Sequence, residues 1–60
     1  MTVYEIFGWI TIDGDVRFFE WDEETETKTE IDRQTAWERT ILYMYAEENS
    51  LVIEVARDDD

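Results

Sequence analysis

The chain has sixty residues and contains neither cysteine nor histidine. Disulfides and zinc sites, the usual supports of very small domains, are therefore missing from its sequence. One hydrophobic core must carry the stability, and at this length such a core leaves a narrow margin. We therefore expect a single domain over residues 1–60, with an acidic tail at 58–60 and support from a second copy of the chain.

Acidic residues dominate the remaining composition. Seventeen Asp and Glu oppose five Lys and Arg, which gives a formal charge of -12. Such a charge repels nucleic acids and anionic membranes and attracts basic protein surfaces. An apolar content of 43%, with 15% aromatic residues, is too high for a disordered acidic chain. The longest apolar runs are too short to cross a bilayer, so we expect a cytoplasmic protein, in the host cell if a phage encodes it.

Residues 3–12 and 16–22 are rich in β-branched and aromatic types, and Asp13, Gly14 and Asp15 separate them. An Asp-Gly pair between two such runs predicts a β-hairpin. Between residues 22 and 31, threonines and Ile31 alternate with charged residues, which indicates either a polar edge strand or a solvated loop. Alternation at 51–56 predicts the last strand.

A helix is predicted from Asp32 or Thr35 to about Asn49. Thr35 and Glu38 have the spacing of a capping box. An apolar stripe at helical spacing would face the core, and it comprises Trp37, Ile41, Met44 and Tyr45. Glu38 would lie at the margin of this stripe, framed by apolar surface.

These elements define an α+β fold with two layers, in which one helix covers an antiparallel sheet of three to four strands in the order β-β-α-β. A right-handed crossover would place the last strand beside the first, giving the spatial order 2-1-3. One helix covers only one face of the sheet, yet the predicted hairpin is apolar on both. We expect a homodimer to bury the second face, unless the polar segment 22–31 folds over it. The interface residues would be Phe7, Trp9, Phe19 and Trp21.

The sequence does not favour an enzyme. Ser50 is the only serine, and no histidine or cysteine is present to act as base or nucleophile. The acidic segments 13–15 and 58–60 lack the ligand spacing of a calcium loop. We therefore expect no catalytic activity, no metal and no cofactor.

Two interpretations of the carboxylates remain open. In the first, they are a solubility device of a structural or adaptor protein from a salt-rich cytoplasm, which Lys28 as the sole lysine would suit. In the second, they take the places of DNA phosphates in a basic groove, where counterion release and apolar anchors favour binding.

Several short segments resemble the small uracil-DNA glycosylase inhibitors of tailed phages that replicate by protein priming. The acidic turn 12–15, the aromatic strand 18–21 around Glu20, and the pairs Trp37-Glu38 and Leu42-Tyr43 carry this resemblance. It implies a homodimer with paired helices, in which Glu38 stands for a DNA phosphate and the aromatics enclose an apolar side chain of the glycosylase. The chain departs from the family by two extra residues before Leu42-Tyr43 and by a longer segment at 22–31.

The functional hypothesis is therefore a DNA-mimicking inhibitor that occupies the basic groove of a DNA-processing enzyme, with uracil-DNA glycosylase as the favoured target. RNA polymerase and restriction or CRISPR nucleases are alternative targets. No direct contact with nucleic acid or membrane is expected. The residues expected to contact the partner are Glu20, Glu23, Glu24, Glu26, Trp37, Glu38 and Tyr45.

Overall fold

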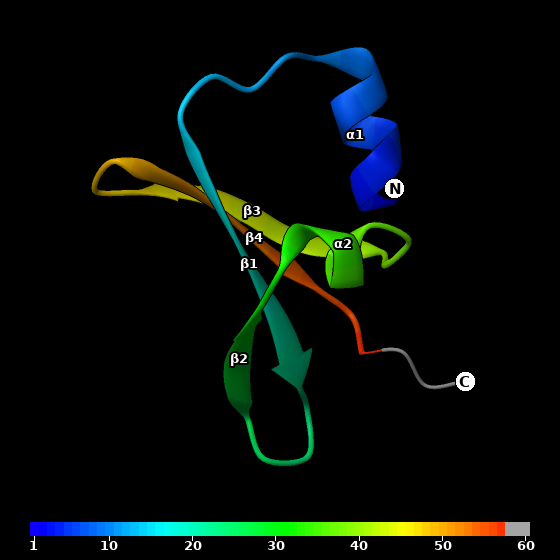
Figure 1. Cartoon of the computed structure of the whole chain (residues 1–60). Helices are drawn as coiled ribbons and strands as arrows, with labels where there is room; N and C mark the ends of the chain where they lie inside the picture. Colours follow the sequence, from blue (N-terminus) through cyan, green and yellow to red (C-terminus); the bar gives the residue numbers. More distant parts are fainter. Residues whose placement is uncertain (58–60) are drawn as a thin grey trace.

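A computed structural model describes residues 1–57 of the chain, and the predicted acidic tail at 58–60 lies outside the described residues. The fold is α+β, as predicted, with a four-stranded sheet in the order β2-β1-β4-β3 (Figure 1). The elements in chain order are α1 (Val3–Trp9), β1 (Asp15–Asp22), β2 (Thr27–Ile31), α2 (Arg33–Ala36), β3 (Ile41–Glu47) and β4 (Ser50–Val55).

The sheet is mixed rather than antiparallel. β1 pairs with β2 and β3 pairs with β4 in antiparallel hairpins, but β1 and β4 run parallel at the centre. The prediction of an all-antiparallel sheet is therefore wrong for the central pair, and the predicted order 2-1-3 is wrong because β1 lies directly beside β4, whereas four strands agree with the three to four predicted. The segment between β1 and β4 contains β2, α2 and β3, so the parallel pair is joined by a long connection, as parallel strands require.

Three strands lie close to their predicted positions. β1 and β4 correspond to the predicted strands at 16–22 and 51–56, and β2 is the polar edge strand, one of the two structures considered for 22–31. In register, Phe18 lies opposite Ile53 of β4 and Ile31 of β2, so these three side chains share one face. Because successive residues of a strand alternate between faces, Phe19 and Trp21 lie on the opposite face from Phe18.

Residues 3–9 form a helix, not the first strand of a hairpin. The Glu5 carboxylate accepts hydrogen bonds from the backbone N–H and the hydroxyl of Thr2, at 2.8 and 2.9 Å, which stabilises the first turn. Val3 and Phe7 are spaced by one turn and face the core. Gly14, at φ 120°, belongs to the loop that leads from α1 into β1 rather than to a tight hairpin turn.

The predicted helix over 32–49 is mostly wrong. Asp32 does cap a helix, because its side chain accepts a hydrogen bond from the backbone N–H of Thr35, but α2 ends at Ala36. Residues 41–47 form the edge strand β3 instead. The four residues of the predicted helical stripe therefore do not share a helix face, and Thr35 and Glu38 form no capping box at a helix start.

Both helices contribute to the core on one face of the sheet. Val3 of α1 and Ala36 of α2 are fully buried together with Phe18, Ile53 and Val55. Figure 1 shows α2 in front of the sheet and α1 near the start of β3. We call the opposite face of the sheet the open face. No helix of residues 1–57 supplies core residues on this face, which presents only side chains of the strands. The open face carries Arg17, Phe19, Trp21, Lys28, Glu30, Tyr43, Tyr45, Val52 and Glu54.

Candidate functional site

The basic side chains are occupied within the protein. Four of them form ion pairs with carboxylates: Arg17 with Glu30, Lys28 with Glu54, Arg39 with Glu20, and Arg57 with Asp22. Arg33 instead lies over the rings of Phe7 and Trp37, at 4.4 and 5.0 Å from their centroids. Little positive charge therefore remains to offset the other carboxylates.

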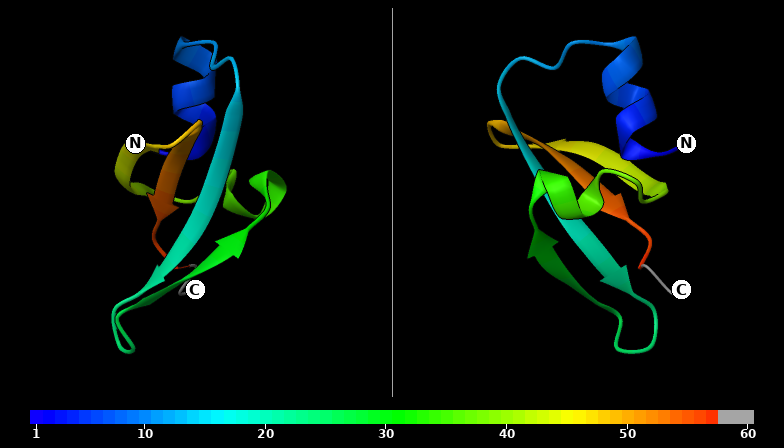
Figure 2. Two further views of the ribbon diagram at one scale, coloured as in Figure 1. Left: turned by 90° about the vertical axis from the view of Figure 1, so that its left-hand side faces the viewer. Right: turned by 45° about the vertical axis from the view of Figure 1, so that its right-hand side comes forward.

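The unpaired carboxylates are exposed and concentrate in turns. Among residues 1–57, the acidic side chains without a basic partner at ion-pair distance are Glu5, Asp13, Asp15, Glu23, Glu24, Glu26, Asp32, Glu38, Glu47 and Glu48. The β1–β2 turn holds Glu23, Glu24 and Glu26, and the β3–β4 turn lies at the opposite end of the sheet (Figure 2). Asp15 pairs with Ser50, which in turn pairs with Glu47, so Asp15 lies near this second turn.

We call these groups the two acidic ends of the sheet: Glu23, Glu24 and Glu26 at one end, and Asp13, Asp15, Glu47 and Glu48 at the other. β1 joins them over eight residues, which corresponds to roughly 25 Å of extended strand. The ends are held apart by a hydrogen-bonded sheet, so their spacing is set by the fold rather than by flexible chain. A rigid pair of anionic clusters can complement a basic groove on another protein.

The open face contains the only buried charged residue among residues 1–57, Glu54, which is 8% exposed. Its Oε2 accepts a hydrogen bond from the Tyr45 hydroxyl at 2.6 Å and lies 3.4 Å from Lys28 Nζ. Lys28 also donates to the Tyr45 hydroxyl at 2.9 Å and lies over the Phe19 ring at 4.9 Å. The hydrogen bond to Tyr45 is the main reason why the pKa of Lys28 is raised.

Arg17 extends the same cluster along β1. It donates two hydrogen bonds to Glu30, at 3.1 and 3.0 Å, and its guanidinium lies 5.1 Å from the Phe19 ring centroid. The two cations of this face are thus each matched by a carboxylate. In contrast to the acidic ends, the open face is close to neutral.

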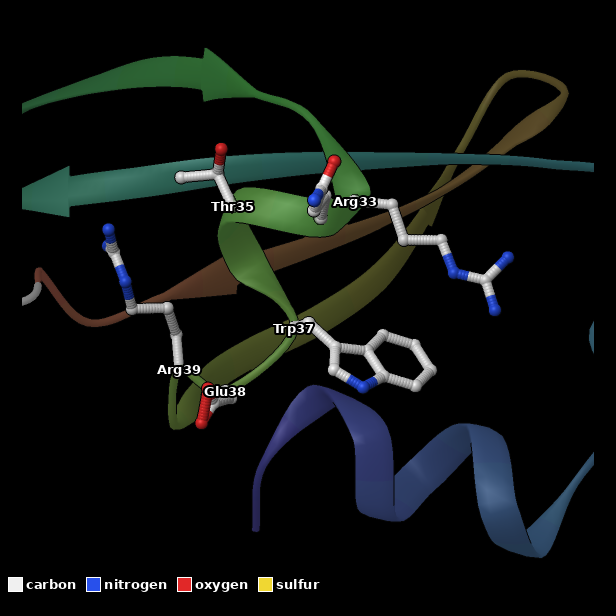
Figure 3. Close-up of a pocket in the computed structure, with 6 residues that line it drawn as sticks. Arg33, Thr35, Trp37, Glu38 and Arg39 are labelled. Atoms are coloured by element: carbon white, nitrogen blue, oxygen red, sulfur yellow. The ribbon is translucent and has the colours of Figure 1, made fainter.

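A surface hollow lies beside α2 and is drawn in Figure 3. Trp37 follows the last residue of α2, and its indole lies against α1, with the Phe7 ring stacked at 5.8 Å and the Tyr4 ring at 6.4 Å. Glu38 and Arg39 leave the turn in directions different from that of Trp37 (Figure 3). Arg39 donates hydrogen bonds to the Glu20 carboxylate at 2.5 Å and to the backbone carbonyl of Ala56 at 3.2 Å.

The predicted partner-binding residues do not form one surface. Glu23, Glu24 and Glu26 lie together and exposed, whereas Glu20 is half-buried and neutralised by Arg39. Two further residues lie beside α2, where Glu38 is exposed and Trp37 is half-buried. Tyr45 is on the open face, bonded to Glu54.

The predicted dimer residues are also divided. Phe19 and Trp21 lie half-buried on the open face, whereas Phe7 packs between the helices and the core face. Trp9, at the end of α1, is 82% exposed. A single sheet-face interface cannot contain all four residues.

Sequence reasoning missed the cluster of Lys28, Tyr45 and Glu54. Its members come from three strands, and their contact depends on the pairing of β1 with β4, which the predicted topology did not contain. The only available signal was a glutamate within the apolar last strand, because a charged residue at a core position needs a partner.

No group of acidic side chains within residues 1–57 has the geometry of a metal site, and none of the described helices is long and apolar enough to cross a membrane. Comparisons with family models, curated proteins and solved structures found no significant match to this chain.

The lowered pKa values of three carboxyl groups indicate how the stability of the fold depends on pH. Hydrogen bonds from Thr2 to Glu5, from Arg17 to Glu30 and from Thr35 to Asp32 hold the pKa of each carboxyl below its ordinary value. Groups with lowered folded-state pKa values stabilise the fold at higher pH, and this contribution disappears as pH falls through those values. We therefore expect the urea concentration at the unfolding midpoint to decrease when the pH is lowered below about 4.

Urea titrations at pH 6 and pH 3 measure this effect. Asp32→Asn is the matched variant, because asparagine also caps helices but does not titrate. It should be as stable as the wild type at pH 6 and lose less stability at pH 3. An equal loss in both proteins would show that the Asp32 cap does not contribute to the acid response.

Proposed function

We propose that this protein binds the basic groove of a DNA-processing enzyme in place of DNA and so inhibits it. The observation that carries the proposal is the division of charge: the basic residues are used internally, and exposed carboxylates gather at two ends of a rigid sheet. Basic grooves hold condensed anions, and a macromolecular polyanion that replaces them gains the entropy of their release.

The acidic ends, rather than the predicted set as a whole, would supply the contacts. Glu23, Glu24 and Glu26 keep this role because they are exposed and unpaired. Glu20 is less suited, because Arg39 already neutralises it. Trp37 is half-buried and packs against the core and the rings of α1, so only part of its indole is available as an anchor.

Uracil-DNA glycosylase is the first target to test. Residues 12–21, which carry one part of the family resemblance, form the end of the loop before β1 and most of β1 itself. β1 is an aromatic strand, as is the corresponding strand of the family. The other part of the resemblance does not extend to the secondary structure. Trp37-Glu38 and Leu42-Tyr43 lie in a turn and in β3, whereas the corresponding pairs of the family lie on a helix. RNA polymerase and nucleases with basic DNA grooves are therefore tested alongside.

The decisive assay is uracil release from labelled duplex DNA. We expect inhibition by the wild type that weakens as salt rises, because the acidic ends are exposed to screening. Replacing Glu23, Glu24 and Glu26 together by Gln should weaken inhibition about tenfold. Replacing the same three residues by Asp retains their charge and should preserve most of the inhibition.

Circular dichroism of both triple variants establishes that the fold is retained. Full glycosylase activity at a large molar excess of the wild-type protein would reject this target, and unhindered polymerase and nucleases would reject the mimicry itself. Unfolding of the isolated protein at low salt, without binding to any of these enzymes, would favour the adaptation of a structural protein to high salt.

A further inference from the structure

The two edges of the sheet differ sharply in chemistry. β2 (Thr27–Ile31) is polar or charged from Thr27 to Glu30, where Lys28 and Glu30 alternate with two threonines, and only its last residue, Ile31, is apolar. β3 carries no charged residue from Ile41 to Ala46. Charged side chains on edge strands prevent pairing with another sheet, whereas a long, apolar edge invites it. β3 is therefore the edge that lacks this protection.

Three of the seven exposed large apolar side chains of residues 1–57 lie on this strand, and the other four lie within residues 1–10. Leu42, Tyr43 and Met44 are consecutive and are 41%, 62% and 45% exposed, respectively. Because successive strand residues alternate between faces, a partner beside the strand would cover side chains on both faces at once. A partner on the open face alone would leave part of this surface in water.

We propose that two copies of the chain associate through antiparallel pairing of β3 with β3 of the second copy, which joins two four-stranded sheets into one. This inference does not rest on the proposed function. A twofold axis makes the same strand available on both copies, so the pairing closes as a dimer and leaves the polar β2 strands at the outer edges.

The register follows from what already covers the strand. The backbone N–H of Ile41 donates to the carbonyl of Met1 at 2.8 Å, so the chain's own N-terminal segment occupies the first residue of β3. The uncharged stretch that remains is centred on Met44. Pairing about that residue places Met44 opposite its own copy and Tyr43 opposite Tyr45 of the second copy, and cross-strand aromatic pairs stabilise sheets.

Charge favours a second copy over a different partner. A basic protein would be drawn to the acidic ends and not to the uncharged edge. Two copies that each carry a charge of -12 repel one another and can approach best along the stretch without carboxylates. In the proposed register each Glu47 lies three residues from the axis, about 10 Å away along the strand, so the two carboxylates do not meet.

Sedimentation velocity at several salt concentrations tests the proposal. We expect a dimer at about 100 µM protein, with the dimer favoured by mass action. Raising NaCl from about 0.1 to 1 M should strengthen the dimer, because salt screens the repulsion between the copies. Binding to a basic groove should weaken under the same change, so failure of one proposal is distinguishable from failure of the other.

Two matched variants add the same charge to opposite edges of the sheet. Tyr43→Glu should raise the dissociation constant at least tenfold, because it places a pair of carboxylates near the axis. Thr29→Glu on β2 should leave it unchanged. A monomer at every protein and salt concentration overturns the proposal, as does an equal effect of both variants. Dissociation by Trp21→Glu with no effect of Tyr43→Glu would assign the interface to the open face instead.

Hydrogen exchange of the wild-type protein covers the case in which Tyr43→Glu does not fold. Amides of β3 should become more protected as protein concentration rises, while those of the other edge strand, β2, should not. Equal exchange of β3 amides in dilute and concentrated protein would reject the β3 interface.

Discussion

Replacing Ile53 by alanine is expected to leave little or no folded protein at 25 °C. Ile53 is completely buried in the central strand β4, opposite both Phe18 and Met44. Truncation of a buried isoleucine to alanine costs about 2–5 kcal/mol through lost burial and the cavity it leaves. A single core in a domain this small rarely supplies more than about 3–5 kcal/mol, so the variant should be largely unfolded.

Ile10→Ala is the matched control, because it removes the same atoms from a side chain that is 48% exposed after the end of α1. It should shift the urea midpoint only slightly. Far-ultraviolet circular dichroism and urea titration of the two variants measure the difference. If Ile53→Ala retained a cooperative transition near that of the wild type, the core would not be centred on β4.

The strands β1, β2 and β4 could be predicted because the local pattern and the tertiary environment agree. In β1, Phe18 enters the core while Phe19 faces the open side, as alternation requires. In β2, alternating threonines and charges suit an edge strand with little burial. In these strands the tertiary contacts favour the same conformation as the local sequence.

The first helix was missed because composition and capping point to different structures. Val3, Tyr4, Ile6 and Phe7 favour a strand by type, and this preference dominated the prediction. Thr2 and Glu5 have the spacing of a capping box, which marks a helix start.

The end of α2 and the β3–β4 hairpin could not be recognised from turn residues. Glu48, at φ 53°, provides the positive φ of the β3–β4 turn, and Glu26, at φ 54°, does the same between β1 and β2. Glycine or asparagine usually occupies such positions, so neither glutamate signals a turn. Without that signal, residues 41–47 match helical spacing as well as a strand.

In the candidate site too, some features follow from the local sequence and others depend on tertiary contacts. The exposure of Glu23, Glu24 and Glu26 follows from their local sequence, because a run of acidic residues after a strand indicates a solvated turn. The neutralisation of Glu20 by Arg39 and the burial of Glu54 depend on contacts between residues distant in the sequence. Charge alone therefore identifies the acidic surface, but topology decides which carboxylates remain available to a partner.

The open face is a structural centre as well as a neutral surface, and this leads to the second large effect. Tyr45→Phe removes the donor that lies 2.6 Å from the Glu54 carboxylate. Because Glu54 is buried, the loss should destabilise the fold by about 1–3 kcal/mol, the usual cost of an unsatisfied buried acceptor. Lys28 remains at 3.4 Å from the same oxygen and would compensate in part.

Tyr43→Phe is the matched control on the same strand, because the Tyr43 side chain is 62% exposed. Urea titrations at low protein concentration should show a clear loss for Tyr45→Phe and almost none for Tyr43→Phe. A double-mutant cycle with Glu54→Gln isolates the contact itself, because the neutral amide demands less from the tyrosine hydroxyl than a carboxylate does. The cost of Tyr45→Phe should therefore shrink in the Glu54→Gln background, whereas equal costs in both backgrounds would mean that the hydroxyl stabilises the fold without acting on the Glu54 charge.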